Sequence, residues 1–143
     1  MNKTQVYYED VEIDSTVPSL VKQPTSRQMV MWAGVSGDYY EIHYDRKFAL
    51  KLGLPDILVQ GGLVASFLGQ MITDWIGEHG ILKKLQTVNK QMMFPNQDII
   101  CTGRAVKKYV AGGNNLVECE IKAEDSKGND LVVGNAIVSL PSH

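Results

Sequence analysis

An aspartate and a histidine stand five residues apart in a segment without a regular hydrophobic period, which reads Ser36-Gly37-Asp38-Tyr39-Tyr40-Glu41-Ile42-His43-Tyr44-Asp45. In a helix, Asp38 and His43 would point about 140° apart, and in an extended strand they would lie about 16 Å apart. They can share a target only if the chain bends between them, and Gly37 permits such a bend. The other two histidines, His79 and His143, are expected to be solvated.

This pair suits the addition or removal of water. A neutral imidazole is a good general base at neutral pH, and a nearby carboxylate can orient a water molecule or carry the second proton. Two other interpretations remain open. The two side chains could simply hydrogen-bond the loop backbone, or Asp38, Glu41, His43 and Asp45 could hold a metal, although they match no defined ligand spacing.

A glycine pair, Gly61-Gly62, follows Gln60 directly before a strongly apolar segment. Free N–H groups at a helix N-terminus carry partial positive charge, and glycine lets a ligand approach them closely. They could therefore hold a carbonyl oxygen that gains negative charge during a reaction. The simpler interpretation is that the glycines only let the loop and the helix pack tightly.

Three helices are expected in the first half of the chain. Thr25 and Gln28 form a capping box before a helix from about 26 to 35, and a shorter helix follows at 45–52. From 62 to 76, apolar residues recur at helical spacing on almost every side. This third helix should therefore be enclosed by other structure.

The rest of the chain alternates between apolar and polar residues, which predicts strands. The expected strands, one before the first helix and four after the third, span residues 17–23, 82–94, 98–110, 116–123 and 131–140. We expect the last four to form an antiparallel meander, and one sheet wrapped around the buried helix gives an α+β fold.

The composition indicates one domain over residues 1–143. The net charge of −2 and the isoelectric point near 5.9 disfavour a nucleic acid partner, which is held mainly by positive charge. No signal peptide is recognised, and the longest uncharged run, 57–73, is too polar for a membrane span. Cys101 and Cys119 are expected to be reduced thiols in the core of a cytoplasmic protein.

The chain resembles the MaoC-like, R-specific enoyl-CoA hydratases and the related 3-hydroxyacyl-thioester dehydratases, which have a hot-dog fold. The family motif has Ser-Gly-Asp, two variable positions, often Asn-Pro, an aliphatic residue, His and an acidic residue, and segment 36–45 follows it. The segment Gln60-Gly61-Gly62-Leu63-Val64-Ala65-Ser66 stands where the family has His-Gly-Met before its central helix.

The resemblance implies a reversible reaction, trans-2-enoyl-CoA plus water to (R)-3-hydroxyacyl-CoA. It assigns catalysis to Asp38 and His43 and the oxyanion hole to the N–H of Gly61. It also places Tyr40, Gln60, Gly62 and Ser66 at the substrate. No metal or redox cofactor is implied, and the partner is an acyl thioester carried by CoA or an acyl carrier protein.

Several residues depart from the family motif. Tyr40-Glu41 replaces Asn-Pro, Gln60 replaces His, and Gly62 replaces Met, which is expected to widen the acyl side of the pocket. Gly69 stands where relatives often have Ser.

The family also implies a homodimer or a higher even oligomer. Two alternative functions remain open, a non-catalytic subunit of a heteromer with another hot-dog chain and an acyl-CoA thioesterase. Six cations could face CoA phosphates or simply be solvated, namely Lys83, Lys84, Lys90, Arg104, Lys107 and Lys108.

Overall fold

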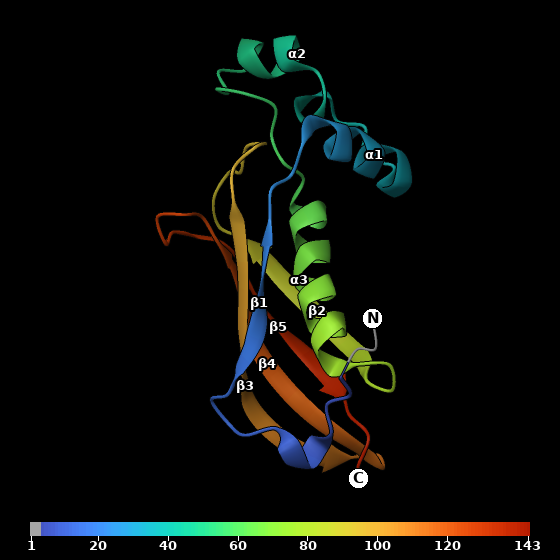
Figure 1. Cartoon of the computed structure of the whole chain (residues 1–143). Coiled ribbons are helices and arrows are strands. Elements are labelled where there is room, and N and C mark those ends of the chain that lie inside the picture. Colours follow the sequence, from blue (N-terminus) through green and yellow to red (C-terminus); the bar gives the residue numbers. More distant parts are fainter. Residues whose placement is uncertain (1–3) are drawn as a thin grey trace.

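The computed structural model describes residues 4–143. Three α-helices, two 3₁₀ turns and five strands follow one another along the chain (Figure 1): η1 Tyr8–Asp10, β1 Thr16–Lys22, α1 Ser26–Ser36, η2 Glu41–His43, α2 Arg46–Lys51, α3 Gly61–Ile76, β2 Ile81–Asn89, β3 Ile99–Ala111, β4 Asn114–Glu124 and β5 Asp130–Ser139. The expected α+β architecture is confirmed.

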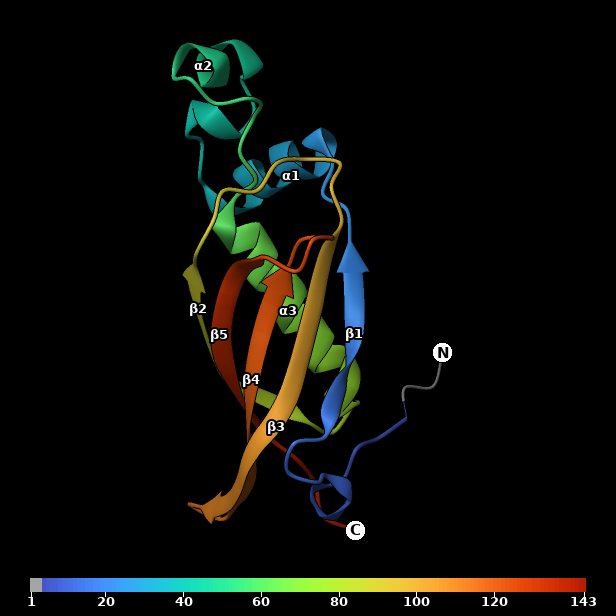
Figure 2. The ribbon, with the colours of Figure 1, turned by 90° about the vertical axis from the view of Figure 1, so that its left-hand side faces the viewer.

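All strand pairs in the five-stranded sheet are antiparallel, and the strand order is β1-β3-β4-β5-β2. The expected meander is right for β3, β4 and β5 but wrong for β2, which pairs with β5 instead of β3. Figure 2 shows the chain leaving β2 and crossing the end of the sheet to reach β3. The strand β2 ends at Asn89. The next two residues, Lys90 and Gln91, both donate their N–H groups to the Leu131 carbonyl, so they do not continue the regular ladder with β5.

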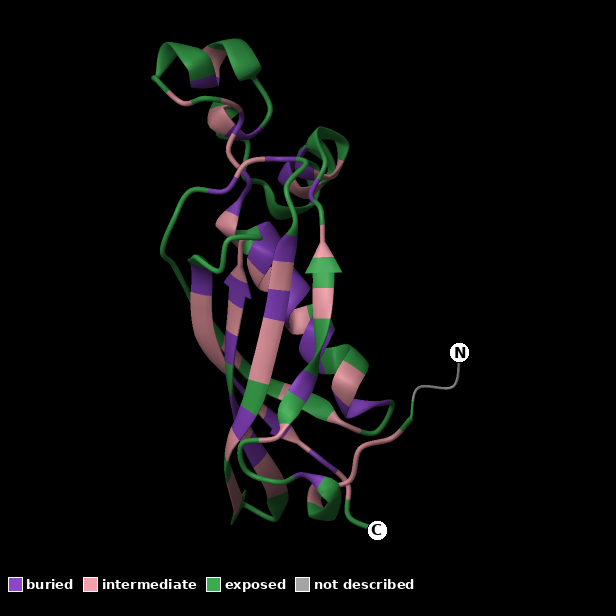
Figure 3. Ribbon diagram, turned by 60° about the vertical axis from the view of Figure 1, so that its left-hand side comes forward, coloured by how far each residue is buried: buried purple, intermediate pink, exposed green. Residues whose placement is uncertain are grey.

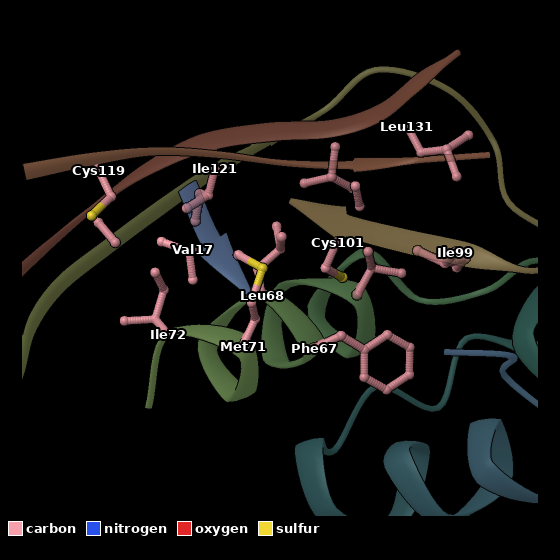
Figure 4. Packing of buried hydrophobic residues seen from close by; sticks show 14 of the residues in the cluster. Val17, Phe67, Leu68, Met71, Ile72, Ile99, Cys101, Cys119, Ile121 and Leu131 are labelled. Atoms are coloured by element: carbon pink, nitrogen blue, oxygen red, sulfur yellow. The ribbon is translucent and has the colours of Figure 1, made fainter. Parts of the chain in front are cut away.

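The helix α3 lies in the curve of the sheet, as in a hot-dog fold (Figure 1). Its apolar face is fully buried and packs on small side chains of the central strands, among them Cys101, Cys119 and Ala136. Figure 4 shows Leu68 and Met71 between α3 and the strands. The enclosure is one-sided within this chain, because Gln70 and Thr73 on the opposite face are exposed.

A helical extension, which we define as residues 26–59, projects beyond one end of the sheet and is largely exposed (Figures 1 and 3). Its helices begin where the sequence supplies caps. Thr25 Oγ1 accepts a hydrogen bond from the Gln28 N–H at 3.2 Å, and Asp45 Oδ1 accepts one from the Phe48 N–H at 3.1 Å. The helix α1 ends at Gly37, whose φ of 76° lies in the left-handed region. Among the described helices, none is long and apolar enough to cross a membrane.

The pairing of β2 with β5 depends on a glycine. A methyl group on Gly134 would collide with the backbone carbonyl oxygen of Gln86 in the neighbouring strand. Gly134→Ala is therefore expected to lower the free energy of unfolding by about 1–3 kcal/mol, measured by urea denaturation. Gly34→Ala in α1 is the matched control because its methyl group meets no atom within 4 Å. It should leave the protein about 0.5–1 kcal/mol more stable, and equal effects of the two substitutions would contradict the packing argument.

Both cysteines are free and buried, as expected from the sequence. Burial raises the pKa of the Cys101 thiol to about 11 and that of the Cys119 thiol to about 12. We therefore expect alkylation by iodoacetamide at mildly alkaline pH to be about a hundredfold slower in the native protein than in urea. Rapid labelling of either thiol without denaturant would contradict this burial.

Candidate active site

The segment between α1 and η2 bends so that the predicted pair meets. Asp38 Oδ2 lies 3.3 Å from His43 Nε2. Two contacts of Asp38 hold the bend: its N–H donates to Ser36 Oγ at 3.2 Å, and its Oδ1 accepts from the Tyr40 N–H at 3.4 Å. The convergence that the spacing required is therefore achieved by a turn held by its own polar groups.

The imidazole of His43 is held by a backbone carbonyl. Its Nδ1 lies 2.6 Å from the carbonyl oxygen of Leu58, and because a carbonyl oxygen only accepts hydrogen bonds, Nδ1 must carry the proton. In the neutral ring, Nε2 therefore presents its lone pair toward Asp38. His43 is 8% exposed, whereas the Asp38 side chain is 44% exposed, so the carboxylate lies on the solvent side of the pair.

Two tyrosines support this loop. The ring of Tyr40 stands nearly perpendicular to the His43 ring, with centroids 6.2 Å apart, and contact between Tyr40 and substrate stays a prediction. Tyr44 donates its hydroxyl hydrogen to the Tyr39 carbonyl at 2.8 Å. Partial desolvation, followed by the nearby Glu41 carboxylate, raises the pKa of Tyr44, so this donor keeps its proton at neutral pH.

Gly61, the first residue of α3, lines the same cavity as His43. The cavity has a volume of about 420 Å³. Its walls come from the end of the helical extension, from Gly61 and from the chain around the end of β2, through Leu58, Val59, Asn89, Lys90, Gln91, Met92 and Met93. Among the described residues, no acceptor is found for the N–H groups of Gly61 and Gly62, as expected for the first turn of a helix.

None of the four residues predicted at the substrate, Tyr40 included, is among the residues that line this cavity. Gln60 is 1% exposed and donates from Nε2 to the Met29 carbonyl at 2.8 Å, so it fastens α3 to α1. An added Cβ on Gly62 would lie 3.3 Å from the Trp32 ring. The expectation of a widened pocket is therefore wrong, because the indole fills the space beside the glycine.

Ser66 lies in a separate groove between α1 and α3, together with Trp32 and Phe67. Its hydroxyl donates to the Leu63 carbonyl within α3 at 2.6 Å. The structure therefore does not bring Ser66 to His43, and contact between Ser66 and substrate stays a prediction for this second groove.

Of the six cations considered for CoA phosphates, Lys90 lines the cavity. Arg104 is instead paired with Asp14 at 2.7 Å and with Glu120 at 2.9 Å. Lys108 donates to the Val11 carbonyl at 2.6 Å. Lys107 lies over the Tyr109 ring, and Lys83 and Lys84 are exposed on β2.

The metal alternative has no assembled ligand set. Within residues 4–143, no three His, Cys, Asp or Glu side chains gather in a way that could hold a metal ion. Asp45, one of the four residues considered, instead caps α2 through Phe48.

Sequence reasoning missed two residues of the site. Leu58 contributes only its carbonyl, which any residue would supply, so no signal marked it. Asn89 ends a strand that lies far from the loop in sequence, and its position beside Gly61 depends on the pairing of β2 with β5.

Comparisons with known proteins agree with this arrangement. Residues 7–125 match the MaoC like domain. A sequence search of curated proteins finds no match. The fold is similar to the R-hydratase PhaJ1 from Pseudomonas aeruginosa, with a TM-score of 0.88 and 18% identity over 97% of this chain and 88% of that chain.

Two further solved structures share the fold. The (R)-hydratase from A. caviae involved in PHA biosynthesis has a TM-score of 0.83 and 19% identity, over 93% of this chain and 99% of that chain. A chain of the ChsH1-ChsH2 complex from Mycobacterium tuberculosis has a TM-score of 0.78 and 20% identity, over 90% and 98%. With the family match extending over most of the sequence, this hot-dog chain belongs to the MaoC-like domain family of hydratases and dehydratases.

Proposed function

We propose that this protein hydrates trans-2-enoyl thioesters reversibly to (R)-3-hydroxyacyl thioesters. The observation that carries the proposal is the 3.3 Å contact between Asp38 and His43, together with the cavity that the His43 ring lines beside the free N–H of Gly61. Membership of the MaoC-like family supports the reaction class, and the substrate and residue roles are part of the proposal.

In the hydration direction, a water molecule beside the pair gives a proton to His43 Nε2, and its oxygen forms a bond to carbon 3 of the enoyl group. The electron pair of the double bond moves toward the thioester carbonyl. The 3.3 Å contact lets the proton that His43 has taken pass to Asp38, and Asp38 delivers it to carbon 2. The proton from water thus ends on carbon 2, its oxygen ends on carbon 3 with the second hydrogen, and the pair returns to its starting state.

The carbonyl oxygen gains negative charge as carbon 3 is attacked. We place this oxygen at the N–H of Gly61, where the helix terminus supplies a donor and partial positive charge. Because Gly61 has no Cβ, the space beside its N–H can be taken by another group, and the Asn89 carboxamide lies there. These groups suffice for the proton transfers, so we propose that no metal or redox cofactor takes part.

Removing either member of the pair should abolish turnover without unfolding the chain. We expect Asp38→Asn and His43→Ala to lower the rate of hydration of crotonyl-CoA by about a hundredfold or more, measured by the loss of absorbance of the conjugated thioester. His79→Ala is the matched control because His79 is exposed and lies outside the cavity. Full activity in both site variants, with unchanged thermal melting, would overturn the proposed function.

The similarity to the ChsH1-ChsH2 complex favours a second candidate, a non-catalytic subunit of a heteromer. The departures Tyr40-Glu41 and Gln60 also motivate it. The purified wild-type chain distinguishes the two candidates, since a catalyst hydrates crotonyl-CoA by itself. Release of free thiol in the same assay would instead identify a thioesterase.

We also propose that the chain is one hot-dog unit that pairs with a second copy along β2. This strand has a neighbour on one side only, and Val88 on it is 57% exposed. An uncovered strand edge can pair with another chain. The exposed face of α3 also leaves room for a partner.

Sedimentation velocity tests this pairing. The wild-type protein should sediment as a dimer, and Val88→Asp should shift it toward monomer because two like charges would meet at the paired edges. Val110→Asp, near the end of β3, is the matched control, since Val110 is also exposed and should leave the dimer intact. A monomeric wild-type protein at micromolar concentration would contradict the proposal.

A further inference from the structure

The side chain of Asn89 lies directly against Gly61. Asn89 is the last residue of β2 and Gly61 is the first residue of α3, and both line the cavity with His43. A Cβ built on Gly61 would overlap the Asn89 carboxamide, with Oδ1 at 2.7 Å. The carboxamide therefore occupies the space that any side chain at position 61 would need, beside the free N–H of the helix terminus.

Among residues 4–143, the carboxamide of Asn89 has no hydrogen-bond partner at either Oδ1 or Nδ2. The side chain is exposed, so water can satisfy it while the cavity holds no ligand. Because no protein group fixes which end of the amide faces Gly61, a ligand can set its orientation.

We propose that Asn89 donates a hydrogen bond from Nδ2 to the thioester carbonyl oxygen, beside the N–H of Gly61. The inference rests on the proposed function, because the substrate is the acyl thioester of that reaction. Two donors that converge on one oxygen stabilise its growing charge more than one donor does. The carboxamide is suited to this role because it is neutral and brings two N–H groups.

A purely spatial role for Asn89 would give a different outcome. If the side chain only fills the space beside Gly61, then aspartate, which has nearly the same shape and no N–H donor when ionised, should replace it without loss. If Asn89 donates to the carbonyl oxygen, Asn89→Asp removes the donor and brings a negative charge to the oxygen that becomes negative.

The test combines turnover with binding in the wild type, Asn89→Asp and Asn89→Ala. Crotonyl-CoA hydration gives kcat and KM, and calorimetry with the saturated analogue butyryl-CoA gives the dissociation constant. We expect Asn89→Asp to lower kcat and kcat/KM by about 10²–10³-fold, with Asn89→Ala reduced less, and both to bind butyryl-CoA more weakly. Asn114→Asp makes the same change in the β3–β4 hairpin, at the other end of the sheet (Figure 2), and should leave kcat unchanged.

The outcomes separate this inference from the proposed function. A wild-type protein that hydrates crotonyl-CoA while Asn89→Asp stays within about twofold of it overturns the role of Asn89 alone. A wild-type protein that binds butyryl-CoA without turnover overturns the hydratase proposal, and weaker binding by Asn89→Asp would still support the donor role. If the wild-type protein binds butyryl-CoA without turnover and Asn89→Asp binds it equally well, the role of Asn89 is overturned. A wild-type protein that neither binds butyryl-CoA nor hydrates crotonyl-CoA also overturns it.

Discussion

The burial of α3 in the curved sheet is the constraint on which the rest of the structure depends. The helix contributes large side chains such as Leu68 and Met71 to the core, and the central strands contribute small ones such as Ala105 and Ala136. Large residues on one surface and small ones on the other let the sheet curve around the helix at close-packed density. This packing fixes where α3 begins, and therefore where the N–H of Gly61 stands.

The site joins this rigid element to the exposed helical extension. His43 and Leu58 both belong to the extension, and the Leu58 carbonyl that holds the His43 ring lies on the segment that leads into α3. One hydrogen bond therefore selects the tautomer and orients the ring relative to Gly61. Gln60 fastens the same junction from the other side through the Met29 carbonyl. The catalytic geometry we propose thus depends on backbone groups as much as on the Asp–His pair.

Local features of the site and the fold could be predicted from the sequence, and long-range ones could not. Short segments of the sequence contain the spacing and periodicity that predict the bend around Gly37, the capped helices and the strands. The pairing partner of β2 could not be predicted in this way, because alternation of apolar and polar residues predicts a strand but not which strand lies beside it. Asn89 was missed for that reason. The widened pocket at Gly62 was wrong because Trp32, which lies far from Gly62 in the sequence on α1, fills the space.

The two walls of the cavity are tied together through main-chain atoms. Val59 donates its N–H to the Met93 carbonyl at 2.8 Å, which joins the two walls, and Lys90 is fixed to the sheet through the Leu131 carbonyl of β5 at 2.8 Å. Main-chain hydrogen bonds survive most substitutions, since every residue except proline supplies the same groups. Over evolutionary time the cavity can therefore keep its width while side chains on its walls, such as the exposed Met92, change freely. Under the proposed function, such a frame would let single substitutions change which acyl groups fit the cavity without altering the reaction.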